Sequence, residues 1–180
     1  MKTYLKGLVK DIIPVILGVL IALIINSWND ARKDRVYVDN FYTSLKKEFS
    51  EAVEEIDRKA PFQRALFDTL GHYSTNEELT LMEVIRKAGG IKGPSIKLNY
   101  WKAISDSKIE LIAYHRLSIL ADIEDGNDIL LYQRNKILDF IYEHLDETGS
   151  REKMILRQML GDVMSTQTSI KQDILEILNE

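Results

Sequence analysis

The chain contains no cysteine among its 180 residues. It therefore cannot form a disulfide, offer a thiolate ligand to a metal, or use a thiol as a nucleophile. The absence does not indicate a compartment, because a protein without cysteine is compatible with either side of a membrane.

A basic stripe is also missing. The chain has 24 Lys and Arg residues against 28 Asp and Glu residues, which gives a net charge of -4, and basic residues alternate with acidic ones along the chain. Nucleic-acid-binding proteins usually gather their positive charge on one face or along one helix. We therefore expect no nucleic-acid partner.

No metal-binding or cofactor motif is present. His72, His115 and His144 are far apart in the sequence and form no pair at helical spacing, so we expect no metal site. The glycine-rich segment 89–94 lacks the Walker spacing and a preceding strand, and we expect no cofactor. No glycine-flanked serine nucleophile occurs either, and the sequence favours a protein that is not an enzyme.

The acidic segment Asp122–Asp128 has the composition of a calcium loop but the wrong register. With Gly126 at the sixth position of an EF-hand loop, Ala121 and Ile123 occupy the first and third positions. Neither side chain carries a ligand oxygen. We interpret the segment as a solvated irregularity in a helix.

What the chain does have is one long uncharged apolar run, from Ile12 to Asn29. Its core, Ile12–Ile25, carries no charge on any helical face, as a helix in lipid requires. Trp28 stands at the distal edge, where aromatic rings favour the membrane interface, and Lys10 can reach headgroups from the proximal edge. The run predicts a transmembrane anchor; a buried core helix and a cleaved signal peptide are the alternatives.

Two sets of residues on this anchor are candidate functional positions. Gly18 and Ala22 form a small-x-x-x-small pair, which would let another helix approach closely. Asp11 and Asn26 are polar residues at the two edges, where we expect Asp11 to be hydrated and Asn26 to bond to water or to a neighbouring helix.

The charges that flank the run are nearly balanced. Lys2, Lys6 and Lys10 precede it, whereas the basic residues that follow it are Arg32, Lys33 and Arg35. We favour a cytoplasmic N-terminus, because a basic tail is typical of a signal anchor and no clear small-x-small cleavage site occurs near residues 26–28. The expected organisation is a cytoplasmic tail (1–11), a transmembrane anchor (12–29) and a soluble all-helical domain (30–180), periplasmic in a bacterium with two membranes.

Apolar residues after Asp30 recur at helical spacing and predict a helical bundle. We expect Pro61 to interrupt or kink the first of these helices. The apolar stripe before that proline comprises Val38, Phe41, Leu45, Phe49, Ala52, Ile56 and Ala60, and the stripe after it Phe62, Leu66, Leu70 and Tyr73.

Capping residues, glycines and apolar spacing predict the boundaries of the remaining elements. Thr80 and Glu83 match a capping box that would start a helix, with Thr75 and Glu78 as a competing box, and Gly89 would end that helix. The pattern further predicts a short helix over 99–105, an extended linker over 108–112, and two long helices, of which the first spans 114–146 with Gly126 as a weak point. The last helix carries a heptad seam, which needs either that neighbouring helix or a second copy of the chain: Leu156, Leu160, Val163, Gln167, Ile170, Ile174 and Ile177.

The anchor and its flank resemble a known family. Residues 18–23 (G-V-L-I-A-L), residues 26–30 (N-S-W-N-D) and the basic Arg32-Lys33 pair are similar to the start of a family of membrane-anchored Bacteroidota proteins of unknown function, and Asp11 matches the family's acidic residue before the apolar run. A fainter similarity covers residues 100–112. The resemblance implies an inner-membrane protein with a helical body, and it supplies no mechanism.

These observations lead to one expected function and one alternative. We expect a single-pass inner-membrane protein whose periplasmic bundle is an accessory or scaffold subunit of an envelope complex. Its partners would be the lipid bilayer and another membrane protein or a second copy of itself. The alternative is a ligand-sensing helical domain that signals through a partner subunit.

Overall fold

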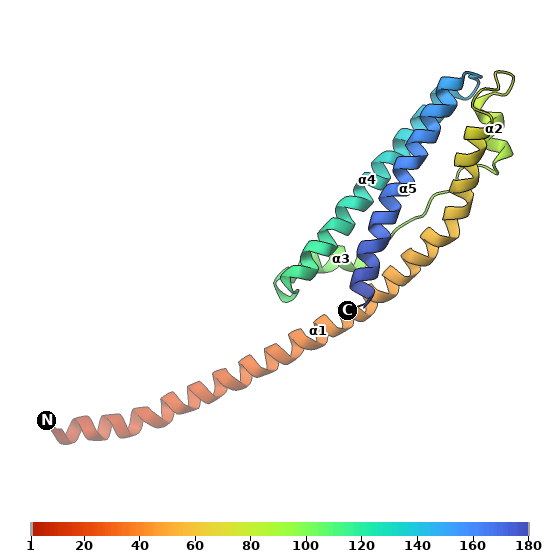
Figure 1. Ribbon diagram of the computed structural model, residues 1–180. Helices are drawn as coiled ribbons and strands as arrows, with labels where there is room; N and C mark the ends of the chain where they lie inside the picture. The colour runs from red at the N-terminus through yellow and green to blue at the C-terminus, as the bar shows by residue number, and fades with distance from the viewer. Residues whose placement is uncertain (1, 180) are drawn as a thin grey trace. The chain divides into compact units, whose positions relative to one another are not determined.

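The computed structural model describes the backbone of residues 2–179 and the side chains of residues 12–179. The described part of the chain is all-α and contains no strand, which confirms the predicted fold class (Figure 1). The elements are, in order, α1 (Lys2–His72), α2 (Leu81–Lys87), α3 (Asn99–Ser105), the 3₁₀ turn η1 (Ile109–Leu111), α4 (Tyr114–His144) and α5 (Ser150–Asn179).

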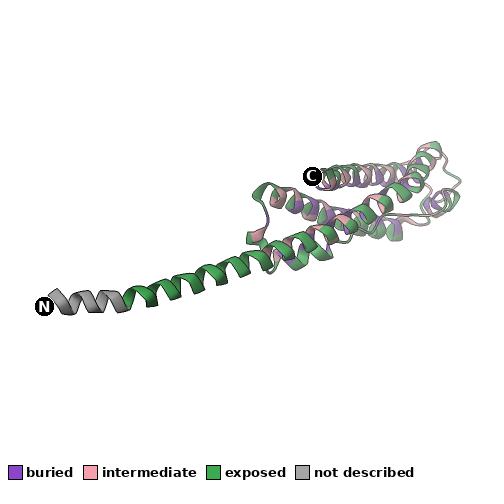
Figure 2. Cartoon of the chain, turned by 90° about the horizontal axis from the view of Figure 1, so that it is seen from below, coloured by how far each residue is buried: buried purple, intermediate pink, exposed green. Residues whose placement is uncertain are grey.

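The chain divides into two compact units, residues 1–43 and residues 44–180. The first unit consists of the N-terminal part of α1, and its described side chains are almost all exposed (Figure 2). The second unit contains the rest of α1 and all later elements, and it has a buried core. We call this second unit the bundle.

Helix α1 continues through Pro61 without a break, so the predicted interruption is wrong. Proline removes one backbone hydrogen bond, but buried residues on both sides of it, such as Ile56 and Leu66, hold the helix against the bundle. The buried face after Pro61 also differs from the predicted stripe. It passes through Gln63, which is 3% exposed, whereas Phe62 is 41% exposed.

Helices α4 and α5 lie side by side and are joined by a short turn (Figure 1). The predicted heptad seam of α5 is buried, which confirms the prediction. Helix α4 packs against it within the same chain. The buried seam residues are Leu156, Leu160, Val163, Gln167, Ile170, Ile174 and Ile177.

Helix α5 is also tied to α1 by polar contacts inside the bundle. Arg157 donates from Nε to the carbonyl of Phe67 at 3.2 Å, and its guanidinium lies 4.1 Å from the centre of the Phe67 ring. Lys171 forms an ion pair with Asp57. Contacts from α5 thus reach both neighbouring long helices.

The predicted capping box at the start of α2 is confirmed. The Thr80 hydroxyl accepts from the backbone N–H of Glu83 at 3.2 Å, and the Glu83 carboxylate accepts from the backbone N–H of Thr80 at 2.9 Å. The carboxylate also accepts from the Thr80 hydroxyl at 3.1 Å, and these two hydrogen bonds from Thr80 to the carboxylate lower the pKa of Glu83 from its usual value. The competing box does not form, since Asn76 accepts from the backbone N–H of Glu78 instead.

Helix α2 ends at the glycines, as predicted. Gly89 and Gly90 have φ angles of +86° and +85°, which residues with a β-carbon rarely adopt. The backbone N–H of Gly90 donates to the carbonyl of Ile85 at 3.0 Å, which closes the last turn of α2.

Two predictions for the later part of the chain need correction. The extended linker over 108–112 is instead the 3₁₀ turn η1, followed by an extended Ile112. The acidic segment Asp122–Asp128 lies within the continuous helix α4 and is not an irregularity. Asn127 inside that segment is buried, so burial of one helical face keeps the segment regular.

Candidate functional site

The first candidate surface is the apolar part of α1 in the N-terminal unit. Its large apolar side chains between Ile12 and Ile25 are 44% to 66% exposed, and the segment forms part of a helix long and apolar enough to cross a membrane. None of its most apolar window is buried. The segment is therefore a candidate membrane span.

The small pair lies on this open surface. A β-carbon on Gly18 would meet nothing within 4 Å, and Ala22 is exposed. The surface around Gly18 therefore has room for a second helix. Whether a second helix packs against this pair stays a prediction.

The distal edge of the apolar segment holds a polar cluster of Asn26, Asp30 and Lys33, of which the sequence analysis singled out only Asn26. The Asn26 amide donates to Asp30 at 3.2 Å, and Lys33 forms an ion pair with Asp30 at 3.3 Å. Asn26 thus has a partner one turn away on its own helix, in addition to any water or neighbouring helix. Trp28 beside it is 68% exposed, as a ring at a membrane interface would be. The side chains of Lys10 and Asp11 lie outside the described residues.

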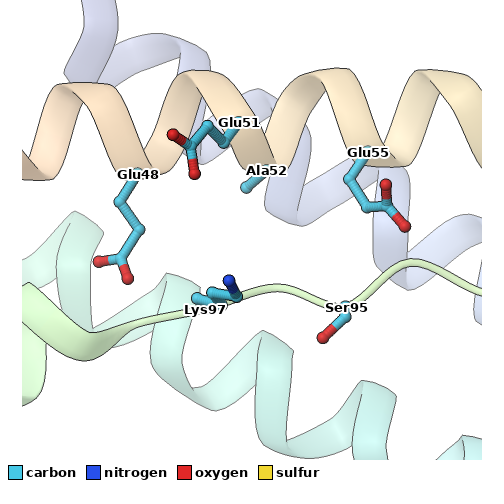
Figure 3. A pocket seen from close by; sticks show the side chains of 6 residues that line it. All are labelled: Glu48, Glu51, Ala52, Glu55, Ser95 and Lys97. Carbon is cyan, nitrogen blue, oxygen red and sulfur yellow. The ribbon is translucent and has the colours of Figure 1, made fainter.

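The second candidate site is a polar groove in the bundle, with a volume of about 290 Å³ (Figure 3). Three carboxylates on α1, those of Glu48, Glu51 and Glu55, line one side of it. Ser95 and Lys97, from the extended segment between α2 and α3, line the other side. Such a row of carboxylates invites a cation or an acid–base role.

Two of these carboxylates already have partners. Glu48 is buried and accepts from the backbone N–H groups of Asn99 at 3.0 Å and Tyr100 at 3.1 Å, and from the Asn99 side chain at 2.9 Å. Glu55 pairs with Arg58 and Lys59 on its own helix. Glu48 therefore acts as the N-terminal cap of α3, and we interpret the groove as structural.

Sequence reasoning missed this cap. The residue before α3 is Leu98, which has no side-chain oxygen, and the first N–H groups of every helix need acceptors. An apolar residue at the capping position is thus a signal that an acceptor must come from elsewhere. The sequence does not say that it comes from a glutamate about fifty residues earlier.

The third candidate site is a cavity of about 230 Å³ within the bundle. It lies between α1, α4, α5 and residues 91–94 of the extended segment. Most of its wall is apolar, with Leu130, Ile137 and Leu138 from α4 and Leu160 and Val163 from α5.

Polar side chains occupy a few positions around this cavity. Gln63 and Gln167 are 3% and 2% exposed, and both line it. The Gln167 amide nitrogen is buried and has no hydrogen-bond partner. Arg134 and Lys92 also line the cavity, and the set of lining side chains includes no carboxylate. Sequence reasoning assigned Gln167 to the heptad seam and did not predict a cavity there.

Other titratable groups have structural surroundings. The Lys153 ammonium is fully buried and donates to the carbonyls of Asn76 and Thr148, and its burial lowers its pKa. Burial raises the pKa of Asp173, and the neighbouring carboxylates of Asp122 and Glu176 raise it further. Among residues 12–179, no group of three or more metal-ligating side chains could hold an ion.

Comparisons with protein-family models, with curated protein sequences and with solved structures gave no match for this chain.

Proposed function

We propose that this chain is a single-pass inner-membrane protein whose helical bundle lies in the periplasm and serves as an accessory or scaffold subunit of an envelope complex. One observation carries the proposal. The uncharged segment Ile12–Ile25 exposes apolar side chains on all faces of a helix, and no part of its apolar window is buried.

The exposure of this segment favours a transmembrane anchor over a buried core helix. A core helix of a soluble protein buries its apolar side chains, whereas those of Ile12–Ile25 remain at least 44% exposed. A continuous apolar surface of this kind on a soluble protein would favour aggregation or membrane binding. Lipid is the environment that suits this surface. The backbone polar groups need no water there, because a helix makes its backbone hydrogen bonds internally.

The orientation and the family relationship belong to the same proposal. The basic tail with Lys10, the absence of a clear cleavage site near Trp28, and the resemblance of residues 18–30 to the Bacteroidota membrane-anchored family support a signal anchor with a cytoplasmic N-terminus. Lys10 and Trp28 would then lie at opposite membrane interfaces.

Protein contacts, and not catalysis, would be the activity of the scaffold. An anchor confines the bundle to two dimensions and raises its effective concentration near a membrane partner. The open surface at Gly18 and Ala22 offers a face for close packing with a helix of that partner or of a second copy.

A ligand sensor is the second candidate function. The observation that favours it is the cavity between α1, α4 and α5, since a bound ligand there would contact three long helices. A sensor of this kind would pass its signal to a partner subunit.

Membrane anchoring is tested by alkaline carbonate extraction of membranes that contain the full chain. We expect the protein to stay in the membrane pellet, as a spanning helix does and a peripheral protein does not. Quantitative release into the supernatant would refute the anchor.

The scaffold function is tested by crosslinking in native membranes, followed by affinity purification and mass spectrometry. Gly18→Leu should lower recovery of the complex at equal membrane abundance, because leucine suits lipid but blocks close helix approach. Ile21→Leu, on another face, is the matched control and should leave recovery unchanged. If both variants recover the complex fully, the contact does not involve the Gly18 face.

A further inference from the structure

We propose that the distal edge of the anchor binds the headgroup phosphate of an anionic phospholipid, through Arg32 and Arg35 beside Trp28. The inference rests on the membrane anchor proposed above and names the lipid that this anchor prefers. It depends neither on the scaffold role nor on the orientation of the chain. All of the residues concerned belong to the N-terminal unit.

One face of α1 joins the apolar segment to the two arginines. Arg32 and Arg35 follow Trp28 by four and seven residues, and Ile24 and Ile21 precede it by the same spacings. At 3.6 residues per turn these five side chains share one face of the helix, and all five are exposed. The face thus presents aliphatic side chains, then an indole ring, then two guanidinium groups. A phospholipid presents its acyl chains and its phosphate in the same order.

Two shallow grooves on this helix meet at Trp28 and Ala31. The groove towards the N-terminus is lined mainly by aliphatic side chains such as Ile24, and the groove beyond Trp28 is lined by Arg32 and Arg35 among others. The small side chain of Ala31 leaves one side of the Trp28 ring open. An acyl chain in the first groove would therefore place its phosphate against the second.

The two arginines have no partner among the described side chains. Lys33 pairs with Asp30 on the opposite face of the helix, whereas Arg32 and Arg35 make no ion pair or hydrogen bond with the part of the chain that the structure describes. A guanidinium group stays charged and can bind two phosphate oxygens at once. Phosphate is thus a suitable ligand for this pair.

The depth of the arginines matches the headgroup layer. A helix rises 1.5 Å per residue, so Arg32 lies about 6 Å and Arg35 about 10 Å beyond Trp28 along the axis. The headgroup layer is about 5–8 Å thick on each side of the bilayer. Side chains of a helix lean towards its N-terminus, which at this edge is the direction of the membrane. Asp39, a carboxylate that lines the second groove, lies about 16 Å beyond Trp28 and thus outside this layer.

The charge of the pair selects a headgroup of net negative charge. Basic residues near a membrane surface strengthen attachment to anionic lipid. Phosphatidylcholine also carries a phosphate, but its quaternary ammonium would bring a third positive charge close to the two guanidinium groups. We therefore expect phosphatidylglycerol to be preferred over phosphatidylcholine.

The test measures quenching of Trp28 fluorescence in vesicles that contain the full-length chain. Two preparations have the same mixture of phosphatidylcholine and phosphatidylglycerol, and bromine is placed on the acyl chains of one lipid or of the other. Bromine quenches an indole ring only at close range. The second tryptophan, Trp101, is buried in the bundle, and its emission is measured in a Trp28→Phe variant and subtracted. We expect brominated phosphatidylglycerol to occupy the site next to Trp28 about threefold more than its share of the mixture predicts.

Three variants locate the site. Arg32→Gln and Arg35→Gln should each lower the preference for phosphatidylglycerol, and the double variant should abolish it. Both positions are exposed, so the helix should remain intact. Lys33→Gln is the matched control, because it makes the same change of charge between the two arginines but on the opposite face. It should keep the preference of the wild type.

The outcomes separate this site from the anchor itself. Equal quenching by the two brominated lipids in the wild type would refute the site and leave the anchor standing, because Trp28 would still lie in the bilayer. Quenching by neither lipid would refute both. If Lys33→Gln lowers the preference as much as the arginine variants do, net charge and not this face attracts the lipid, and the assignment is wrong.

A further arm distinguishes a lipid headgroup from free phosphate. Inorganic phosphate in place of chloride, at equal ionic strength, should leave the preference for phosphatidylglycerol unchanged, since the first groove contributes only to binding of a lipid. Loss of the preference would assign Arg32 and Arg35 to free phosphate and overturn the proposal.

Discussion

Gly126 on α4 and Ile170 on α5 are in direct contact. A β-carbon built on Gly126 would lie 2.7 Å from Cγ1 of Ile170, closer than real side chains approach each other. Glycine at this position therefore lets the two helices pack with Ile170 fully buried between them. The residue that the sequence marked as a weak point of the helix is a packing position.

Replacing Gly126 with alanine should destabilise the bundle by about 1–3 kcal/mol, the usual cost of overpacking a core. This loss should exceed the gain of up to about 1 kcal/mol that alanine brings to a helix. Urea unfolding followed by circular dichroism measures the difference.

Gly161→Ala is the matched control, because its β-carbon would meet Cε2 of Phe67 at an ordinary 3.6 Å. We expect it to be neutral or stabilising. Ile170→Ala alone should cost about 2–5 kcal/mol through the cavity that it leaves. The double variant Gly126→Ala/Ile170→Ala should be more stable than the sum of the two losses predicts, and simple additivity would disprove the contact.

Removal of the Glu48 carboxylate should destabilise the start of α3, which it caps. Glu48→Ala leaves the backbone N–H groups of Asn99 and Tyr100 without their acceptor, and we expect a loss of about 1–3 kcal/mol in stability. Glu48→Gln retains one acceptor oxygen, so its stability should lie between that of the wild type and that of Glu48→Ala. Amide hydrogen exchange at Asn99 and Tyr100 should accelerate in the alanine variant, and unchanged exchange there would contradict the capping role. Glu51→Ala, an exposed carboxylate in the same groove, serves as the control.

The crowded carboxylate Asp173 predicts a pH dependence of stability. Burial and the nearby Asp122 and Glu176 raise its folded-state pKa, so the folded state binds the proton more tightly than the unfolded state does. The contribution of Asp173 to stability therefore increases as the pH falls through the raised folded pKa towards the unfolded value. At neutral pH, Asp173→Asn should be more stable than the wild type. Thermal unfolding at a series of pH values should show this advantage shrink in acid, and a constant difference would contradict the mechanism.

A charge in the apolar segment should weaken membrane insertion. Leu20→Arg should cost about 2.5–3.5 kcal/mol on the translocon scale for a mid-bilayer position. A glycosylation-reporter insertion assay measures the inserted fraction, with Leu20→Ile as the control. Equal insertion of both variants would mean that residues 12–25 do not form the span.

Local signals in the sequence predicted several elements of this fold correctly. Thr80 and Glu83 carry a capping box, Gly89 carries a helix stop, and the heptad positions of α5 from Leu156 to Ile177 are buried as expected. These features depend on residues a few positions apart, so their spacing alone contains the information. The predicted break at Pro61 and the predicted irregularity at 122–128 are wrong, because burial against distant helices outweighs the local preference for a break.

The candidate sites also differ in whether the sequence alone predicts them. The apolar segment around Gly18, Asn26 and Trp28 follows from the sequence, since lipid requires only that a helix lack charge on every face. The cap that Glu48 gives α3 joins residues 51 positions apart, and the cavity around Gln167 joins residues from separate segments of the chain between Gln63 and Gln167. Such contacts depend on how the helices pack, because packing decides which side chain faces which. The sequence by itself determined the helices and the candidate membrane span, and only the tertiary structure decided where buried polar groups meet.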